Sequence, residues 1–201
     1  MNPLDELDWP ARDGGTEPLD QPHHRLRAAA VRYVTHGWRV LPGSVWDGQR
    51  YTLGHVPTPV DGLVPVMLSG RSFGQPRQAS SWWSVAPYTI LARAGADFDV
   101  VSAPTPLVGR ALQHGALFHA KAPVFGVGAR AWLLVRPGFR LRRVPGVRLA
   151  EQGSVVALPP TPLPGGQLRW WTSPEQTGWC PGDGDAAQAA LMAALDRPEP
   201  R

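Results

Sequence analysis

The sequence predicts an α+β fold in which helices flank a mixed, largely antiparallel sheet. Apolar residues recur at helical spacing near both ends of the chain, while the middle consists of short β-like runs. The 201 residues include 22 glycines and 23 prolines, which favour short elements joined by many turns. With 43% hydrophobic residues, the chain can bury a core and is short enough to form one domain.

The first part of the chain begins with the clearest helix. We predict it over 22–36, because Pro22 suits a first helical turn and Gly37 suits a helix end. Five residues at helical spacing form its apolar face: Leu26, Ala29, Ala30, Tyr33 and Val34. Short strands follow at 38–41, 50–56 and 63–68, and a Trp-containing helix covers 75–85.

The second part alternates strands with turns and ends in a helix. Apolar runs bounded by Gly or Pro predict strands over 88–94, 98–103, 122–128, 130–138, 153–160 and 167–173. A helix is predicted to start near Thr105, directly after the strand at 98–103. A hairpin is predicted from the strands at 122–128 and 130–138. The last helix covers 183–197, with Asp183 or Asp185 as its N-cap.

The ends of the chain and its single cysteine bear on organisation and compartment. Residues 1–20 are predicted to be a flexible acidic arm, 21–196 one domain, and 197–201 a tail. The arm lacks the apolar segment of a signal peptide, and no apolar run approaches about 18 residues. Cys180 is the only cysteine and has no internal disulfide partner. These features predict a cytoplasmic protein that does not enter a membrane.

Positive charge is supplied almost wholly by arginine. The net charge is +4, and Lys121 is the only lysine among 20 basic residues. Arginine suits bidentate phosphate contacts, although a GC-rich genome would also favour it. The densest cluster is predicted to bind nucleic acid or to be an ordinary solvated loop: Arg136, Arg140, Arg142, Arg143 and Arg148.

Asp97 and Asp99 introduce the strand at 98–103. Carboxylates at i and i+2 of a strand point to the same face and could share a divalent cation. The alternative is that both lie in solvent at the strand entrance. Spacing alone leaves both interpretations open.

Two pairs of adjacent tryptophans, Trp82–Trp83 and Trp170–Trp171, could stack on unpaired bases. In a strand, however, one of two neighbouring side chains faces the core. We therefore expect at least one tryptophan of each pair to pack inside.

Several stretches in order resemble the Prim-Pol domain, the N-terminal module of bifunctional DNA primase/polymerases in the archaeo-eukaryotic primase superfamily. They are "AAAVRYVTHGWRVLPGS", "SWW", "GVRLAEQGSVVALPPT" and "RWW" before a C-terminal helix. The likeness covers roughly residues 25–195. It implies a Prim-Pol-like α+β fold and a role in DNA replication.

The resemblance also implies a site with an acidic pair, a histidine and a further aspartate, which together bind divalent metals and a nucleoside triphosphate. We align the family's motifs with this chain by the apolar runs next to each motif. The acidic pair then falls on Ser102 and Pro104, the histidine near Trp132 and the last aspartate on Arg148. None of these side chains can take the role of the carboxylate or histidine expected at its position in binding metal or triphosphate.

If this alignment were wrong by a residue or two, Asp97, Asp99 and Glu151 could take the acidic roles. A slip of one residue, however, turns the side chains of a strand to its other face, so each position would need a separate rescue.

Three interpretations follow. The first is a degenerate nucleotidyltransferase fold that has no intact catalytic residues and uses no cofactor. Such a module would bind single-stranded DNA, another nucleic acid or a protein. The second is an active DNA primase/polymerase that uses Asp97 and Asp99 with Mg²⁺ or Mn²⁺. The third is an unrelated α+β interaction protein, which predicts that the strands at 98–103, 131–135 and 154–158 are not neighbours. Convergence of Ser102, Trp132 and Arg148 on one site would favour the resemblance, and wide separation would oppose it.

Overall fold

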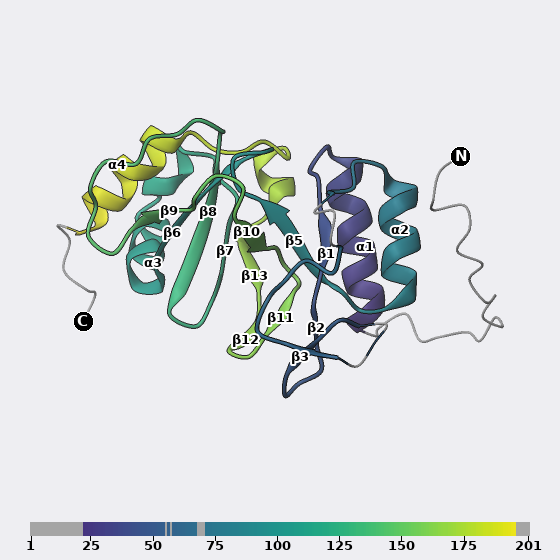
Figure 1. Cartoon of the computed structure of the whole chain (residues 1–201). Helices are drawn as coiled ribbons and strands as arrows, with labels where there is room; N and C mark the ends of the chain where they lie inside the picture. The colour runs from purple at the N-terminus through teal and green to yellow at the C-terminus, as the bar shows by residue number, and fades with distance from the viewer. Residues whose placement is uncertain (1–21, 55, 57, 68–70, 196–201) are drawn as a thin grey trace.

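The computed structural model describes residues 22–54, 56, 58–67 and 71–195 (Figure 1). The predicted arm at 1–20 and tail at 197–201 lie outside these residues. The α+β class is confirmed, because the described residues form four α-helices together with strands whose named pairings are all antiparallel. In the described part of the chain, no helix is both long and apolar enough to cross a bilayer.

The four helices match the predicted ones closely. They are α1 (Pro22–Thr35), α2 (Pro76–Val85), α3 (Thr105–Gln113) and α4 (Gly184–Leu195). Gly37 follows α1 with a positive φ of 85°, which glycine adopts without strain. Asp183 is the cap of α4, since its carboxylate accepts a hydrogen bond from the Ala186 amide at 2.9 Å.

The central five-stranded sheet has the order β13-β7-β8-β6-β9. Its strands are β6 (Asp99–Pro104), β7 (Val124–Val127), β8 (Arg130–Val135), β9 (Arg148–Leu149) and β13 (Arg169–Thr172). The predicted hairpin is confirmed as β7–β8. In Figure 1, α3 and α4 lie at one end of the molecule with this sheet, and α1 and α2 at the other.

Three smaller sheets complete the fold. The first has the order β1-β5-β10 and consists of β1 (Leu41–Gly43), β5 (Thr89–Arg93) and β10 (Val155–Ala157). The second contains β2 (Val45–Trp46), β3 (Tyr51–Thr52) and β4 (Pro59–Val60), and the third pairs β11 (Pro162–Leu163) with β12 (Gly166–Gln167). Short 3₁₀ helices η1 (Ala116–Phe118) and η2 (Pro174–Thr177) occupy two of the connections.

Two predicted strands differ from the structure for identifiable reasons. The strand expected at 38–41 begins only at Leu41, because earlier amides are bonded elsewhere: Trp38 to the Tyr33 carbonyl and Arg39 to the Asp97 carboxylate. The segment 63–67 forms an isolated bridge at Pro65 rather than a strand. Proline lacks the amide proton that a continuing ladder needs. The rest of that prediction, at 68, lies outside the described residues.

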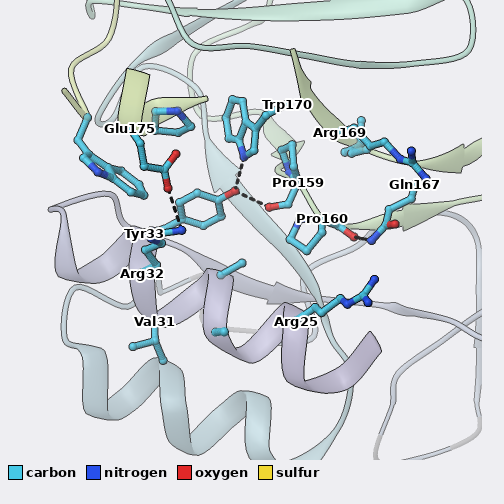
Figure 2. Close-up of a pocket in the computed structure, with 15 residues that line it drawn as sticks. Arg25, Val31, Arg32, Tyr33, Pro159, Pro160, Gln167, Arg169, Trp170 and Glu175 are labelled. Atoms are coloured by element: carbon cyan, nitrogen blue, oxygen red, sulfur yellow. Dashed lines mark hydrogen bonds and ion pairs between the residues drawn. The ribbon is translucent and has the colours of Figure 1, made fainter. Parts of the chain in front are cut away.

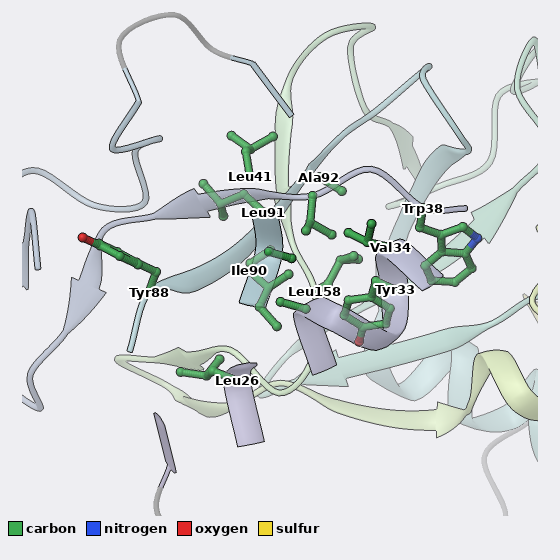
Figure 3. Close-up of a cluster of buried hydrophobic side chains, with 14 of the residues drawn as sticks. Leu26, Tyr33, Val34, Trp38, Leu41, Tyr88, Ile90, Leu91, Ala92 and Leu158 are labelled. Carbon is green, nitrogen blue, oxygen red and sulfur yellow. The ribbon is translucent and has the colours of Figure 1, made fainter. Parts of the chain in front are cut away.

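The sheet separates two hydrophobic clusters. Alternate residues of β6 and β8 face opposite sides, so Val100 and Leu134 join one cluster while Val101 and Leu133 join the other. The first cluster extends to α1, α2 and the β1-β5-β10 sheet; Figure 3 shows part of it around Tyr33. The second lies against α3 and α4.

Candidate functional site

One row of residues crosses all five strands of the central sheet. Their Cα atoms are direct partners in the sequence Trp170, Phe125, Trp132, Ser102, Arg148. We call these five residues the cross-sheet row. The three positions identified by the apolar frames, on β8, β6 and β9, are therefore immediate neighbours in the sheet.

The cross-sheet row lies on the face of the first hydrophobic cluster. Trp132 and Trp170 pack against that cluster, while the residues on either side of Ser102 belong to the second. The rings of Phe125 and Trp132 are stacked with centroids 5.5 Å apart, and Trp170 meets Phe125 edge-on at 5.0 Å. Burial decreases along the row, from the buried Phe125 to the half-buried Ser102 and the exposed Arg148 at the sheet edge.

Each of the two strands next to Ser102 carries an arginine near it. Arg130, the Cα partner of Pro104, donates from Nη2 to the Ser102 hydroxyl at 2.8 Å and from Nη1 to the Gly146 carbonyl at 3.1 Å. Arg148 is the Cα partner of Ser102 on the other side. Sequence reasoning missed Arg130, although its position two residues before Trp132 puts both side chains on the same face.

The residues at this site do not fit the divalent metals that the resemblance implies. Such ions need oxygen ligands, preferably carboxylates. The aligned positions offer one hydroxyl, which already accepts a guanidinium proton, with a proline, a tryptophan and a second guanidinium. A cation beside Ser102 would meet the charge of Arg130. More generally, no group of three or more His, Cys, Asp or Glu residues that could hold a metal occurs within the described ranges.

Asp97 and Asp99 do not form the pair that the metal interpretation requires. Strand β6 begins at Asp99, and Asp97 lies in the preceding bend. The Asp97 carboxylate accepts three hydrogen bonds from Arg39: from its amide at 2.6 Å, from Nε at 2.9 Å and from Nη2 at 2.7 Å. The hydrogen bonds that Arg39 donates to the Asp97 carboxylate raise the pKa of the Arg39 guanidinium. Asp97 therefore joins the turn before β6 to the segment before β1.

Asp99 lies on the other side of the sheet from Ser102. They are three positions apart along β6, an odd number, so alternation places Asp99 with Val101 on the α3/α4 side. Its carboxylate accepts the Phe139 amide at 2.9 Å and is almost fully buried. It lines a shallow hollow of about 480 Å³ together with Glu151 and Arg140. The carboxylates of Asp97 and Asp99 are thus engaged by Arg39 and by the Phe139 amide, not by residues of the cross-sheet row.

We expect the substitution Asp97→Ala to lower the stability of the fold. It removes three hydrogen bonds to a charged group, but the Arg39 side chain is half exposed, so we expect a loss of about 1–2 kcal/mol. Denaturant unfolding measures this change. The exposed ion pair Asp47–Arg50 supplies a control. Asp47→Ala removes contacts within one turn, and these contacts do not join segments that are distant in the sequence. Equal losses in the two variants would contradict the structural role of Asp97.

The predicted arginine cluster lies largely on the segment 136–147, which connects β8 to β9. All five guanidinium-bearing residues of the cluster are exposed. Arg136 and Arg142 lie 3.8 Å from the carboxylates of Asp183 and Asp185, respectively. Arg140, Arg143 and Arg148 make no ion pair with any described residue. Exposure of these arginines agrees with both alternatives, a solvated loop and a surface that binds an anion.

The tryptophan pairs divide between core and surface as expected. Trp83 is fully buried and Trp82 half-buried on α2; Trp170 packs against the first cluster, and Trp171 is exposed on β13. The strand predicted at 153–160 is β10, which pairs with β5 rather than with the central sheet. The strands at 98–103 and 131–135, β6 and β8, are thus neighbours, and β9 pairs with β6. The strand at 154–158, β10, is not their neighbour, which is what the unrelated-fold interpretation expects of it.

A second candidate site, which sequence reasoning missed, is an open groove of about 830 Å³ between α1 and the segment 159–179 (Figure 2). We call it the α1 groove. Arg25, Ala28, Ala29 and Arg32 line its helical side. Pro159, Pro160, Gln167, Arg169, Trp170, Glu175 and Trp179 line the rest. Its walls come from segments more than 120 residues apart, so no local motif could reveal it.

The base of the α1 groove is held by Tyr33. Its hydroxyl donates to the Pro159 carbonyl and accepts from Trp170 Nε1 at 3.2 Å. Burial raises the pKa of this phenol far above its ordinary value, so the hydroxyl stays protonated. At one end, Arg32 pairs with Glu175 at 2.9 Å and lies 5.9 Å over the Trp179 ring.

Comparison of the chain with protein-family models, curated proteins and solved structures found no significant match.

Proposed function

We propose that this chain is a Prim-Pol-like module that lacks metal-dependent nucleotidyl transfer and binds nucleic acid, with single-stranded DNA as the first ligand to test. One observation carries the proposal: three independently aligned positions, Ser102, Trp132 and Arg148, are direct neighbours across three strands. The chance of such coincidence is small, because these positions are separated by 30 and 16 residues along the chain. Their identities support loss of metal chemistry.

The charge at the cross-sheet row supports the choice of ligand. Where the resemblance expects carboxylates that hold cations, this chain has Ser102 with Arg148 as its Cα partner and with Arg130 donating to its hydroxyl. Guanidinium groups bind phosphate oxygens directly, so no bridging metal is required. The unpaired Arg140 and Arg143 on the neighbouring segment extend the positive surface.

The test is binding of a labelled single-stranded oligonucleotide, measured by fluorescence anisotropy with EDTA present. We expect binding without metal and a loss of affinity of roughly one to two orders of magnitude between about 50 mM and 200 mM salt, as phosphate contacts are screened. Failure to bind at low salt would remove the nucleic-acid proposal and leave a protein partner. Binding that requires Mg²⁺ would contradict the metal-free site.

A primer-extension assay with Mg²⁺ and with Mn²⁺ separates the proposal from the active alternative. We expect no nucleotide incorporation by the wild type, because the carboxylates of Asp97 and Asp99 are bonded away from the row. Incorporation that disappears in Asp99→Ala would establish the active primase/polymerase instead.

A further inference from the structure

The cross-sheet row contains three aromatic rings, and two of them are engaged away from Ser102. Phe125 is fully buried. Trp170 meets Phe125 edge-on, donates from Nε1 to the Tyr33 hydroxyl at 3.2 Å and lines the α1 groove. Trp132 is half-buried, and among the described residues Phe125 is the only aromatic ring in contact with it. Trp132 is therefore the ring of the row that has surface left beside Ser102.

One face of the Trp132 ring is covered by Phe125, and the other face lies towards β6. The two rings stack with planes 16° apart, and Phe125 belongs to β7, which borders β8 on one side. The strand on the other side is β6, where the Cα partner of Trp132 is Ser102. Because Ser102 has a small side chain, it covers little of that face. A flat ligand can therefore stack on Trp132 from the side of β6.

Two guanidinium groups flank this face of Trp132. Arg130 precedes Trp132 by two residues, so it lies on the same face of β8 and about 7 Å along the strand. Arg148 is two strands from Trp132, which corresponds to about 10 Å. The hydrogen bonds of Arg130 go to the Ser102 hydroxyl and the Gly146 carbonyl, which carry no charge and leave the guanidinium charge uncompensated.

An aromatic ring between two guanidinium groups matches the two chemical parts of a nucleotide. A base stacks on the ring, and its flanking phosphates accept hydrogen bonds from arginine. Because base and phosphates are covalently joined, a nucleotide on Trp132 brings its phosphates within reach of Arg130 and Arg148.

We infer that Trp132 stacks on one unpaired base of single-stranded DNA, and that Arg130 and Arg148 bind the phosphates beside that base. This inference rests on the proposed function, because it concerns the same row of residues. It adds a reason for preferring single strands, since a base within a duplex is paired and stacked on its neighbours and exposes no face. Every base has a π-face, so we expect binding that tolerates many sequences.

The test compares two oligomers of equal length and equal phosphate number: oligothymidylate, and an oligomer in which every residue is abasic. The affinity of the full chain for each is measured by fluorescence anisotropy at low salt with EDTA present. We expect oligothymidylate to bind at least about fivefold more tightly, which is the lower end of what one stacked base contributes.

Substitution of Trp132 should reduce this affinity ratio. In Trp132→Leu we expect a ratio close to one, because leucine keeps an apolar contact with Phe125 but has no flat ring. Trp132→Phe should retain part of the ratio. The matched control is Trp171→Leu, because Trp171 is exposed and lies against Gly126, on the opposite face of the sheet from Phe125. We expect the wild-type ratio in this control.

Arg148→Glu separates stacking from charge. Both oligomers carry the same phosphates, so we expect this variant to weaken the binding of both to a similar extent and to keep the ratio.

Equal binding of the two oligomers by the wild type would overturn the inference and leave the proposed function standing. A ratio that survives in Trp132→Leu would also overturn it, because the base would then be bound elsewhere. If neither oligomer binds at low salt, the proposed function fails and the inference fails with it. The wild-type comparison requires no substitution, so it decides the question even if Trp132→Leu does not fold.

Discussion

Replacing Trp83 by alanine is expected to destabilise the fold by about 3–5 kcal/mol. Trp83 is fully buried between α2 and the first cluster, and its indole Nε1 donates to the Tyr88 carbonyl at 2.7 Å. The substitution leaves a large cavity and removes the donor from a buried carbonyl, which adds to the cost of lost apolar burial. Against a typical stability of about 5–15 kcal/mol, this is a large fraction.

Thermal unfolding checks the result, and a loss of this size corresponds to a fall in Tm of roughly 6–20 °C for a chain of this length. The control is Trp82→Ala on the same helix, where the half-buried ring makes tilted contacts with Phe73 and Tyr88. We expect the Trp82 variant to lose clearly less. Equal losses, or a larger one in Trp82→Ala, would show that the helix packs differently from the structure described.

Reversing the charge of Arg148 is expected to weaken single-stranded DNA binding about tenfold at low salt and to make the salt dependence shallower by about one phosphate contact. Arg148 is exposed at the edge of the sheet, beside Ser102, and has no ion-pair partner within the described residues. Arg148→Glu therefore removes one guanidinium from the proposed phosphate surface and adds a repulsive carboxylate, while the buried side of β9 is kept by Leu149.

The control for Arg148→Glu is Arg77→Glu. Arg77 is exposed on α2, which Figure 1 shows at the far end of the molecule from β9, and its reversal changes the net charge by the same amount. We expect nearly wild-type affinity in this variant. If the two variants weaken binding equally, attraction is a property of total charge, and the cross-sheet row is not the site.

Prediction from sequence succeeded where a single element carries its own periodicity. The helix at 22–35 and the hairpin at 124–135 follow from apolar spacing and from the turn residues beside them. The start of β1 could not be predicted, because the amides of Trp38 and Arg39 are engaged by a carbonyl and a carboxylate outside the strand. Local propensity carries no information about such partners.

The candidate site shows the same division. Aligning apolar runs located Ser102, Trp132 and Arg148, since alternation determines which residues share a face. It could not show that Arg130 reaches Ser102, because that contact depends on the rotamer of a long side chain. The separation of Asp97 from Asp99 was also hidden, because it depends on whether β6 begins before or after Phe98.

The alternation of β6 and β8 between two hydrophobic clusters has a consequence for how the molecule unfolds. The same backbone supports Val100 and Leu134 on one side and Val101 and Leu133 on the other. If either hydrophobic cluster opened, one face of β6 and β8 would be exposed to water. The free energy of opening one cluster therefore includes contacts of strands that the other cluster also needs. We therefore expect the two clusters to unfold together, with the slowest amide hydrogen exchange in β6 and β8.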